Sequence, residues 1–201
     1  MLDLSPGPIH LSYGPGAGAT TLCLSISATV LECGNKVIWI TRESLDPERA
    51  SQVLGKLGEE SLLRLTIFRI KDRLANSITS IRTLIERMER DDLLVVDDWC
   101  ERHGRANPGD IEAIHELVFR KPECGVIITS AYVSSPAPKQ GGNIGGLTPR
   151  GGRALNELVR VVFLYDDMQK VGHRILNDSG QKSQICLSSS GFSPIYPHSS
   201  E

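Results

Sequence analysis

The sequence predicts an α/β fold in which a doubly wound, mostly parallel sheet ends in antiparallel strands. Two near-continuous apolar runs, VIWIT at 37–41 and LLVVD at 93–97, are typical of parallel strands that are covered on both faces. Segments with helical spacing of apolar residues alternate with such strands, which indicates helices packed on one shared sheet. Three short strand-like runs separated by turn residues, at 159–165, 173–176 and 184–188, favour the antiparallel ending.

The amino-terminal part has the pattern of a strand, a glycine-rich turn and a helix, in the segment IHLSYGPGAGATT at 9–21. Leu22, Ile26 and Val30 form one apolar stripe of a helix over 20–33. This order is that of a P-loop, in which backbone N–H groups and a helix N-terminus hold phosphates.

The later elements alternate between strand and helix. Asp46 and Pro47 fit the cap and the first position of a helix. The next predicted elements are a strand at 64–70, a helix at 74–90, a strand at 93–97, a helix at 110–120, a strand at 125–129 and a short helix at 153–158. A Gly- and Pro-rich loop at 130–152 is long enough to be functional or disordered. We expect residues 1–190 to form a single domain and residues 191–201 to be a flexible carboxyl-terminal tail.

The composition is that of an ordinary globular protein and excludes several classes of function. The formal net charge of −2 gives no global positive field, so a nucleic-acid site would be a local basic patch. The five cysteines lack CxxC spacing and follow no signal peptide, which argues against a metal site and for the reducing cytoplasm. No apolar run approaches the roughly 18–20 residues that a membrane span needs.

The P-loop pattern is degenerate. The motif requires a Gly, four residues, a second Gly, a Lys and then Ser or Thr, but only three residues separate Gly14 from Gly18, and Ala19 stands at the lysine position. Losing a hydrogen bond to a charged group lowers affinity by roughly ten- to a hundredfold. Thr20 still offers a hydroxyl to a metal ion. We therefore expect weak binding of ATP and Mg²⁺ and no efficient hydrolysis.

Two acids are candidates for the chemistry of the same site. Asp97 ends an apolar strand, as does the carboxylate that orients Mg²⁺ in P-loop proteins; the alternative is a strand-end acid that caps a turn. Glu43 follows the strand at 37–41, where a carboxylate can accept a proton from an attacking water; the alternative is an exposed loop acid.

Basic residues gather in two loops that should open on one side of the sheet. Flexible loops that carry Arg and Lys can hold a nucleic-acid backbone without reading its sequence. The alternative is ordinary solvated surface charge. The candidate DNA-binding residues are Arg102, Arg105, Lys139, Arg150 and Arg153.

Several segments together resemble the RecA-type recombinases, especially archaeal RadA and its paralogue RadB. The segment VIWITRESLDPERA resembles a strand and helix start of that family, and LLVVDD and GVIITSAY resemble its following strands. The glycine-rich loop resembles its second DNA-binding loop, and NELVRVVFLYD resembles the next helix and strand. The resemblance covers residues 8–190 and rests on the order and spacing of these motifs.

The resemblance implies a RecA-like P-loop core and assigns roles by position. Glu43 matches the glutamate that activates water, and Asp97 matches the aspartate that orients magnesium. The matching phosphate-loop residues lie within the set Gly14, Gly16, Ala17, Gly18, Ala19, Thr20 and Thr21. Ala19, Thr41 and Ala131 depart from the family pattern.

The function that this resemblance implies is that of a recombinase paralogue. Such a protein would assist homologous recombination and DNA repair, bind DNA, preferably single-stranded, or a RecA-type partner, and hydrolyse ATP weakly or not at all. Two alternatives remain open. One is a functional ATPase with a rewired phosphate site, and the other is a KaiC-like regulatory module that acts without nucleotide.

Overall fold

The computed structural model describes residues 2–5, 7–120, 122–134 and 146–195. Its strands are β1 (Ile9–Tyr13), β2 (Val37–Thr41), β3 (Leu65–Arg69), β4 (Leu93–Asp97), β5 (Gly125–Ala131), β6 (Val133–Ser134), β7 (Leu147–Thr148), β8 (Arg160–Asp166), β9 (His173–Asp178), β10 (Gln181–Ser188) and β11 (Gly191–Pro194). Its helices are α1 (Ala19–Glu32), α2 (Pro47–Leu54), α3 (Glu59–Leu62), α4 (Leu74–Ile85), α5 (Pro108–Phe119) and α6 (Gly152–Asn156).

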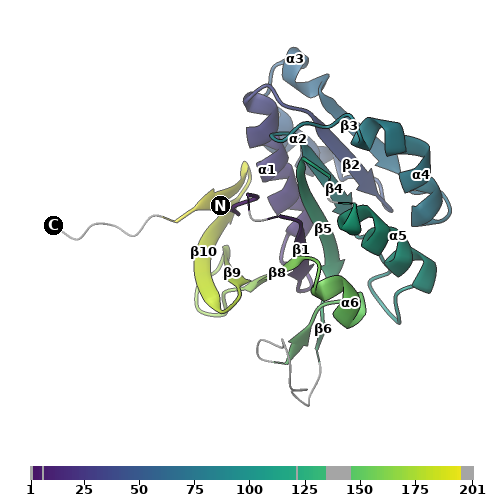
Figure 1. The fold of residues 1–201 in the computed structure, drawn as a ribbon. Helices are drawn as coiled ribbons and strands as arrows, with labels where there is room; N and C mark the ends of the chain where they lie inside the picture. The colour runs from purple at the N-terminus through teal and green to yellow at the C-terminus, as the bar shows by residue number, and fades with distance from the viewer. Residues whose placement is uncertain (1, 6, 121, 135–145, 196–201) are drawn as a thin grey trace.

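One nine-stranded sheet organises the molecule, in the order β11-β10-β9-β8-β1-β5-β4-β2-β3 (Figure 1). The strands from β8 to β3 in that order pair in parallel. From β8 to β11 the pairing is antiparallel. The predicted fold class is therefore confirmed. Because parallel strands point the same way, β1, β2, β4 and β5 all end at one edge of the sheet.

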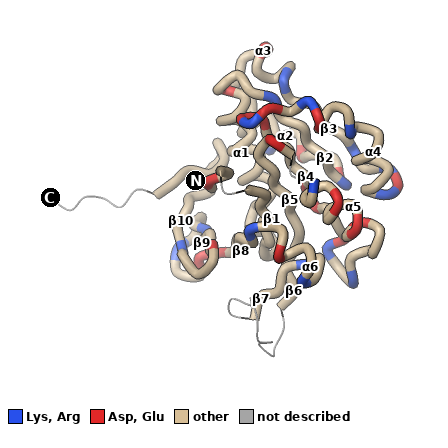
Figure 2. Tube along the Cα trace, viewed as in Figure 1, with Lys and Arg blue, Asp and Glu red and all other residues tan. Residues whose placement is uncertain are grey.

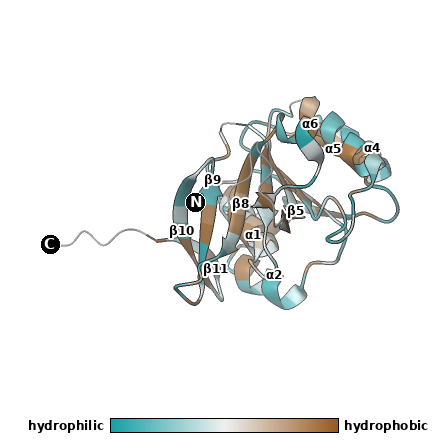
Figure 3. Cartoon of the chain, turned by 90° about the horizontal axis from the view of Figure 1, so that it is seen from below, coloured by the Kyte–Doolittle hydropathy of each residue, from teal (hydrophilic) through white to brown (hydrophobic). Residues whose placement is uncertain are grey.

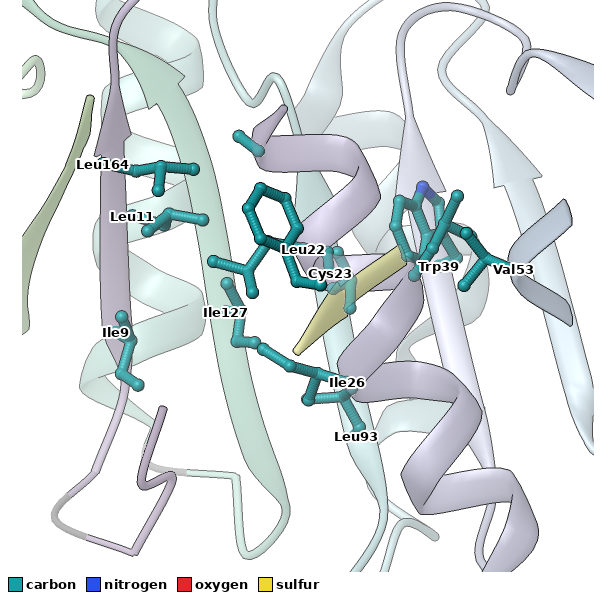
Figure 4. Close-up of a cluster of buried hydrophobic side chains, with 14 of the residues drawn as sticks. Ile9, Leu11, Leu22, Cys23, Ile26, Trp39, Val53, Leu93, Ile127 and Leu164 are labelled. Carbon is teal, nitrogen blue, oxygen red and sulfur yellow. The ribbon is translucent and has the colours of Figure 1, made fainter. Parts of the chain in front are cut away.

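Alternating residues of the buried strands serve two separate cores. Leu93 and Val95 pack with α1 and α2 on one face, while Leu94 and Val96 pack with α4 and α5 on the other. Figure 4 shows part of the first core, where Leu22 and Ile26 of α1 lie against strand residues such as Ile127. In Figure 3, α4, α5 and α6 lie on one side of the sheet and α1 and α2 on the other.

Several element boundaries shift by a few residues, and two segments differ more from the sequence prediction. The helix predicted at 74–90 ends at Ile85, because the carboxylate of Asp92 accepts hydrogen bonds from the backbone N–H of Glu89 (2.8 Å) and of Lys36 (2.7 Å) and holds the chain in a turn before β4. The loop predicted at 130–152 contains the end of β5, the hairpin of β6 and β7, and the start of α6; residues 135–145 lie outside the described part of the chain.

The predicted flexible tail from residue 191 is wrong at its start. Phe192 in β11 is 8% exposed and pairs with Leu187 of β10. Its backbone N–H donates to the Ser25 hydroxyl of α1 at 2.9 Å. The sequence hides this strand because its apolar residue follows a run of serines. Residues 196–201, the rest of the predicted tail, lie outside the described residues.

Among the described residues, no helix combines the length and the apolar character that crossing a bilayer would require.

Replacing Gly191 with Ala tests the packing of β11. Gly191 has a φ of +107°, and an added Cβ would clash with the Ser25 hydroxyl. Gly180 has a similar φ of +93° but open space around it, so Gly180→Ala isolates the backbone strain. We expect Gly180→Ala to lower the free energy of unfolding by about 1 kcal/mol. Gly191→Ala should cost roughly 1–3 kcal/mol more in urea denaturation, and equal losses would contradict the packing.

Candidate functional site

The glycine-rich loop joins the end of β1 to the start of α1. Gly16 and Gly18 adopt left-handed φ values of +68° and +85°. Gly18 is also the N-cap of α1 and makes no side-chain cap bond. The first N–H groups of a helix have no partner within the helix, so the start of α1 offers donors to an anion.

The phosphate cradle is smaller than the sequence predicts. The Gly14 N–H donates to the Leu164 carbonyl of β8 at 2.9 Å, and the Ala17 N–H donates to the Gly14 carbonyl at 3.1 Å. These two N–H groups are therefore engaged within the protein, and Gly14 and Ala17 are corrected from phosphate-binding to structural positions. The shortened loop explains this, since Gly14 continues the pairing between β1 and β8 in place of opening the cradle.

Ala19 occupies the lysine position of the motif and is 4% exposed. Its side chain packs in the core cluster on the α1 face of the sheet. An added Cβ on the preceding Gly18 would lie 3.3 Å from the Phe192 ring, so β11 closes one side of this loop. Position 19 therefore contributes a methyl group to the core and supplies no charge to the site.

Asp97 at the end of β4 connects the loop to the sheet. Its Oδ2 accepts a hydrogen bond from the Thr20 hydroxyl of α1 at 3.0 Å, and its Oδ1 accepts one from the Thr129 hydroxyl of β5 at 2.8 Å. Asp97 is 4% exposed. The carboxylate and the first turn of α1 are thus in contact, and the role of Thr20 and Asp97 as magnesium ligands stays a prediction.

Asp98 is the most constrained residue of the site. Its φ of +52° is uncommon for a residue with a side chain. The Tyr13 hydroxyl donates to its Oδ1, and the Arg102 Nε donates to its Oδ2 at 2.8 Å. The Arg102 Nη2 completes an ion pair with the same oxygen at 2.7 Å. Its own N–H donates to the Thr129 hydroxyl at 2.8 Å. Residues from two other strands and the following loop therefore hold this acid in place.

A cavity of about 290 Å³ opens beside these groups. It is lined by Thr20, Thr21, Leu24, Thr41, Glu43, Ser44, Leu45, Asp46, Arg49, Asp97, Asp98 and Arg102. Glu43 and Asp97, predicted from separate strand ends, thus share one cavity with the start of α1. The catalytic role of Glu43 stays a prediction.

Arg49 and Thr129 are site residues that sequence reasoning missed. The Arg49 Nε donates to the Thr21 hydroxyl at 3.1 Å, and its two terminal nitrogens donate to the carbonyls of Ser188 (2.9 Å) and Ser189 (3.0 Å). Thr129 was detectable, because it lies near the end of the strand next to β4. Arg49 was not, because these carbonyls lie about 140 residues away, at the end of β10 and in the turn after it.

The candidate DNA-binding residues do not form one surface. Arg150 is 9% exposed and donates to the carbonyls of Ala131 (3.0 Å) and Gly104 (2.6 Å), so its prediction as a DNA contact is corrected to a structural clamp. Arg102 lines the cavity. Arg105 is exposed, and Arg153 is exposed and paired with Glu157 at 2.6 Å; both remain predicted contacts. Lys139 lies outside the described residues.

Burial raises the pKa of Asp97 from 3.8 to about 6, and the nearby Asp98 carboxylate adds to the shift, while the Thr129 and Thr20 hydroxyls oppose it. Burial and the Asp98 contact likewise raise the pKa of Tyr13 well above its usual range, so the phenol stays protonated and donates to Asp98. A nearby cation would therefore lower the pKa of Asp97 and favour its ionised form.

Asp97→Asn should stabilise the folded protein more at neutral than at acidic pH. The folded state holds the Asp97 proton up to about pH 6 and the unfolded chain only to about 3.8, so the contribution of this carboxyl to stability falls as the pH rises between those values. Between pH 4 and pH 7, the variant should gain on the order of 2 kcal/mol relative to wild type in urea unfolding. A difference that is constant with pH would contradict a buried carboxyl with a raised pKa.

Comparison with known proteins places this geometry within one fold. No protein-family model and no curated protein matches the chain. Among solved structures, a DnaB-like replicative helicase matches with a TM-score of 0.67 at 12% identity over 94% of this chain, which spans 57% of the helicase chain. The isolated ATPase domain of a second protein matches with a TM-score of 0.68 at 13% identity, covering 94% of this chain and 85% of that chain. A KaiC-like protein from Pyrococcus horikoshii OT3 matches with a TM-score of 0.64 at 18% identity, covering 95% and 89%. The chain therefore has a RecA-like P-loop fold.

Proposed function

We propose that this chain is a RecA-type accessory module that binds a nucleoside triphosphate and Mg²⁺ weakly. In this proposal it assists homologous recombination and DNA repair by holding DNA or a RecA-type partner. The single observation that carries the nucleotide part is the 3.0 Å contact between the Thr20 hydroxyl and the Asp97 carboxylate.

That contact brings together the two oxygen ligands a P-loop offers to magnesium. Mg²⁺ prefers oxygen ligands and commonly takes one or two carboxylates, several waters and the phosphates of its substrate. Thr20 and Asp97 would hold the ion at the mouth of the cradle, where it would neutralise phosphate charge. The residues present fit such an ion. The likeness to an ATPase domain gives further support.

Slow hydrolysis follows from the missing charge at position 19, because charge on the phosphates develops in the transition state. One observation favours a second candidate, a working ATPase. Glu43 lines the cavity that Thr20 and Asp97 also line, where a carboxylate is suited to activate water.

The DNA part is supported by two exposed arginines, Arg105 and Arg153. Arg105 follows β4 and Arg153 lies in the first turn of α6, which comes after the β6–β7 hairpin beyond β5. Since β4 and β5 end at one edge of the sheet, both loops leave from that edge. Figure 2 shows that basic and acidic positions are interspersed over most of the chain, so any DNA contact depends on a few residues.

Calorimetry with ATP and Mg²⁺ tests the nucleotide proposal. Wild type should bind with an affinity that depends on Mg²⁺, and Thr20→Val should weaken the binding roughly tenfold by removing one metal ligand. Thr29→Val, on the exposed side of α1, is the matched control and should bind like wild type. Binding that is absent in wild type, or equal in Thr20→Val, would refute the proposal. Phosphate release is measured in the same samples. Release by wild type that the Glu43→Gln substitution abolishes would favour the ATPase instead.

Fluorescence anisotropy with labelled single-stranded DNA tests the DNA proposal. The double variant Arg105→Ala/Arg153→Ala should bind more weakly and lower the slope of log affinity against log salt by about 0.7 per lost contact. Arg82→Ala/Arg120→Ala, on α4 and after α5, removes the same charge and should leave the slope unchanged. Two double variants with the same slope, or a wild type without salt-sensitive binding, would refute it.

A further inference from the structure

The cavity holds more negative than positive groups, although its proposed ligand is an anion. Four carboxylates line it, from Glu43, Asp46, Asp97 and Asp98, against two arginines, Arg49 and Arg102. A single Mg²⁺ would offset part of this charge but not the charge of a triphosphate as well. Without a lysine at position 19, the phosphates need a cation from another element of this chain.

Arg49 is already committed to structural contacts. Its guanidinium bonds the Thr21 hydroxyl, the Gln52 side chain (2.9 Å) and the carbonyls of Ser188 and Ser189. Turning it to a phosphate would leave two carbonyls without their donor and release the β10–β11 turn from α2. This arginine is therefore a poor source of the missing charge.

Arg102, in contrast to Arg49, makes few structural contacts through its guanidinium. Its side chain is 52% exposed, and within the described part of the chain its guanidinium bonds Asp98 alone, through Nε and Nη2 to the same oxygen. Nη1 makes no hydrogen bond to any described residue. A guanidinium can bind a carboxylate along one side and a phosphate along another, because its five N–H donors lie in a fixed plane.

The surroundings fix Arg102 in position. The Arg150 clamp holds the carbonyls of Arg102 and Gly104, so the main chain that carries this side chain is pinned to the end of β5. Asp98, its partner, is held in turn by Tyr13 and by its own backbone bond to Thr129. Such preorganisation lowers the cost of ordering a long side chain on binding.

We propose that Arg102 is the phosphate-binding cation of this site, supplying from the loop after β4 the charge that Ala19 lacks. The proposal rests on the proposed nucleotide binding. It also replaces the sequence-based prediction of Arg102 as a DNA contact, since the side chain is used within the cavity.

Calorimetric titration of the full chain with ATP–Mg²⁺ tests this proposal in four proteins. Arg102→Gln should lose roughly ten- to a hundredfold in affinity, as expected for one charged hydrogen bond. Arg82→Gln, which breaks another (i, i+4) ion pair on the far helix α4, should bind like wild type. The double variant Asp98→Asn/Arg102→Gln removes both members of the pair and should remain as weak as Arg102→Gln. Urea denaturation checks that the double variant folds. Because it removes both charges of the ion pair, it leaves no unpaired carboxylate at position 98, and it still tests the proposal if Arg102→Gln alone misfolds.

The outcomes separate the proposal from four alternatives. If the double variant regains wild-type affinity, Arg102 only neutralises Asp98 and the proposal is overturned. If Arg102→Gln binds like wild type, Arg102 makes no phosphate contact. Titration with adenosine, which has no phosphates, should not distinguish Arg102→Gln from wild type, and a similar loss with adenosine would show a general structural effect instead. Wild type that binds no ATP–Mg²⁺ refutes the proposed nucleotide binding itself.

Discussion

The hydrogen bond between Thr20 and Asp97 is the contact on which the arrangement of the site depends. It joins residues 77 positions apart, and it forms only because β1, β5 and β4 are neighbours in a parallel sheet. Parallel order brings their carboxyl ends to one edge, and the turn after β1 aims the start of α1 at that edge. Thr129, on the strand between them, ties the same carboxylate to the sheet. The strand order of the RecA-like fold therefore brings the residues of the candidate site together.

The loss of lysine has consequences for the charges around this contact. Asp97 is buried beside Asp98, so its pKa is raised, and a nearby cation would favour its ionised form. Asp98 is offset by Arg102 and held by the Tyr13 hydroxyl. The two acids offer carboxylate oxygens to a metal ion, but a bound triphosphate would need positive charge from another residue. In the proposed function, nucleotide binding is weak and Arg102 supplies the positive charge that Ala19 lacks.

The fold and part of the site were predictable from sequence because they depend on local pattern. Apolar runs and their spacing identified the parallel strands, and an acid at a strand end identified Asp97. The remaining features depend on tertiary contacts. Arg150 had the sequence context of a surface arginine, but three main-chain carbonyls surround it. Gly14 fitted the cradle by its spacing, but the shortened loop left it in the sheet. The strand β11 follows a polar turn and is stabilised by packing on α1, which no local signal reports.

In the proposed function, the start of α1 and the end of β4 form a phosphate and metal site. Amide chemical shifts of the isotope-labelled protein, followed by NMR during titration with ATP–Mg²⁺, test this most directly. The largest shifts should fall on Gly18, Ala19, Thr20 and Asp97, with none on α4 and α5, which lie on the other side of the sheet from α1 (Figure 3). Shifts confined to α4 and α5, or an absence of shifts at millimolar ATP–Mg²⁺, would contradict it.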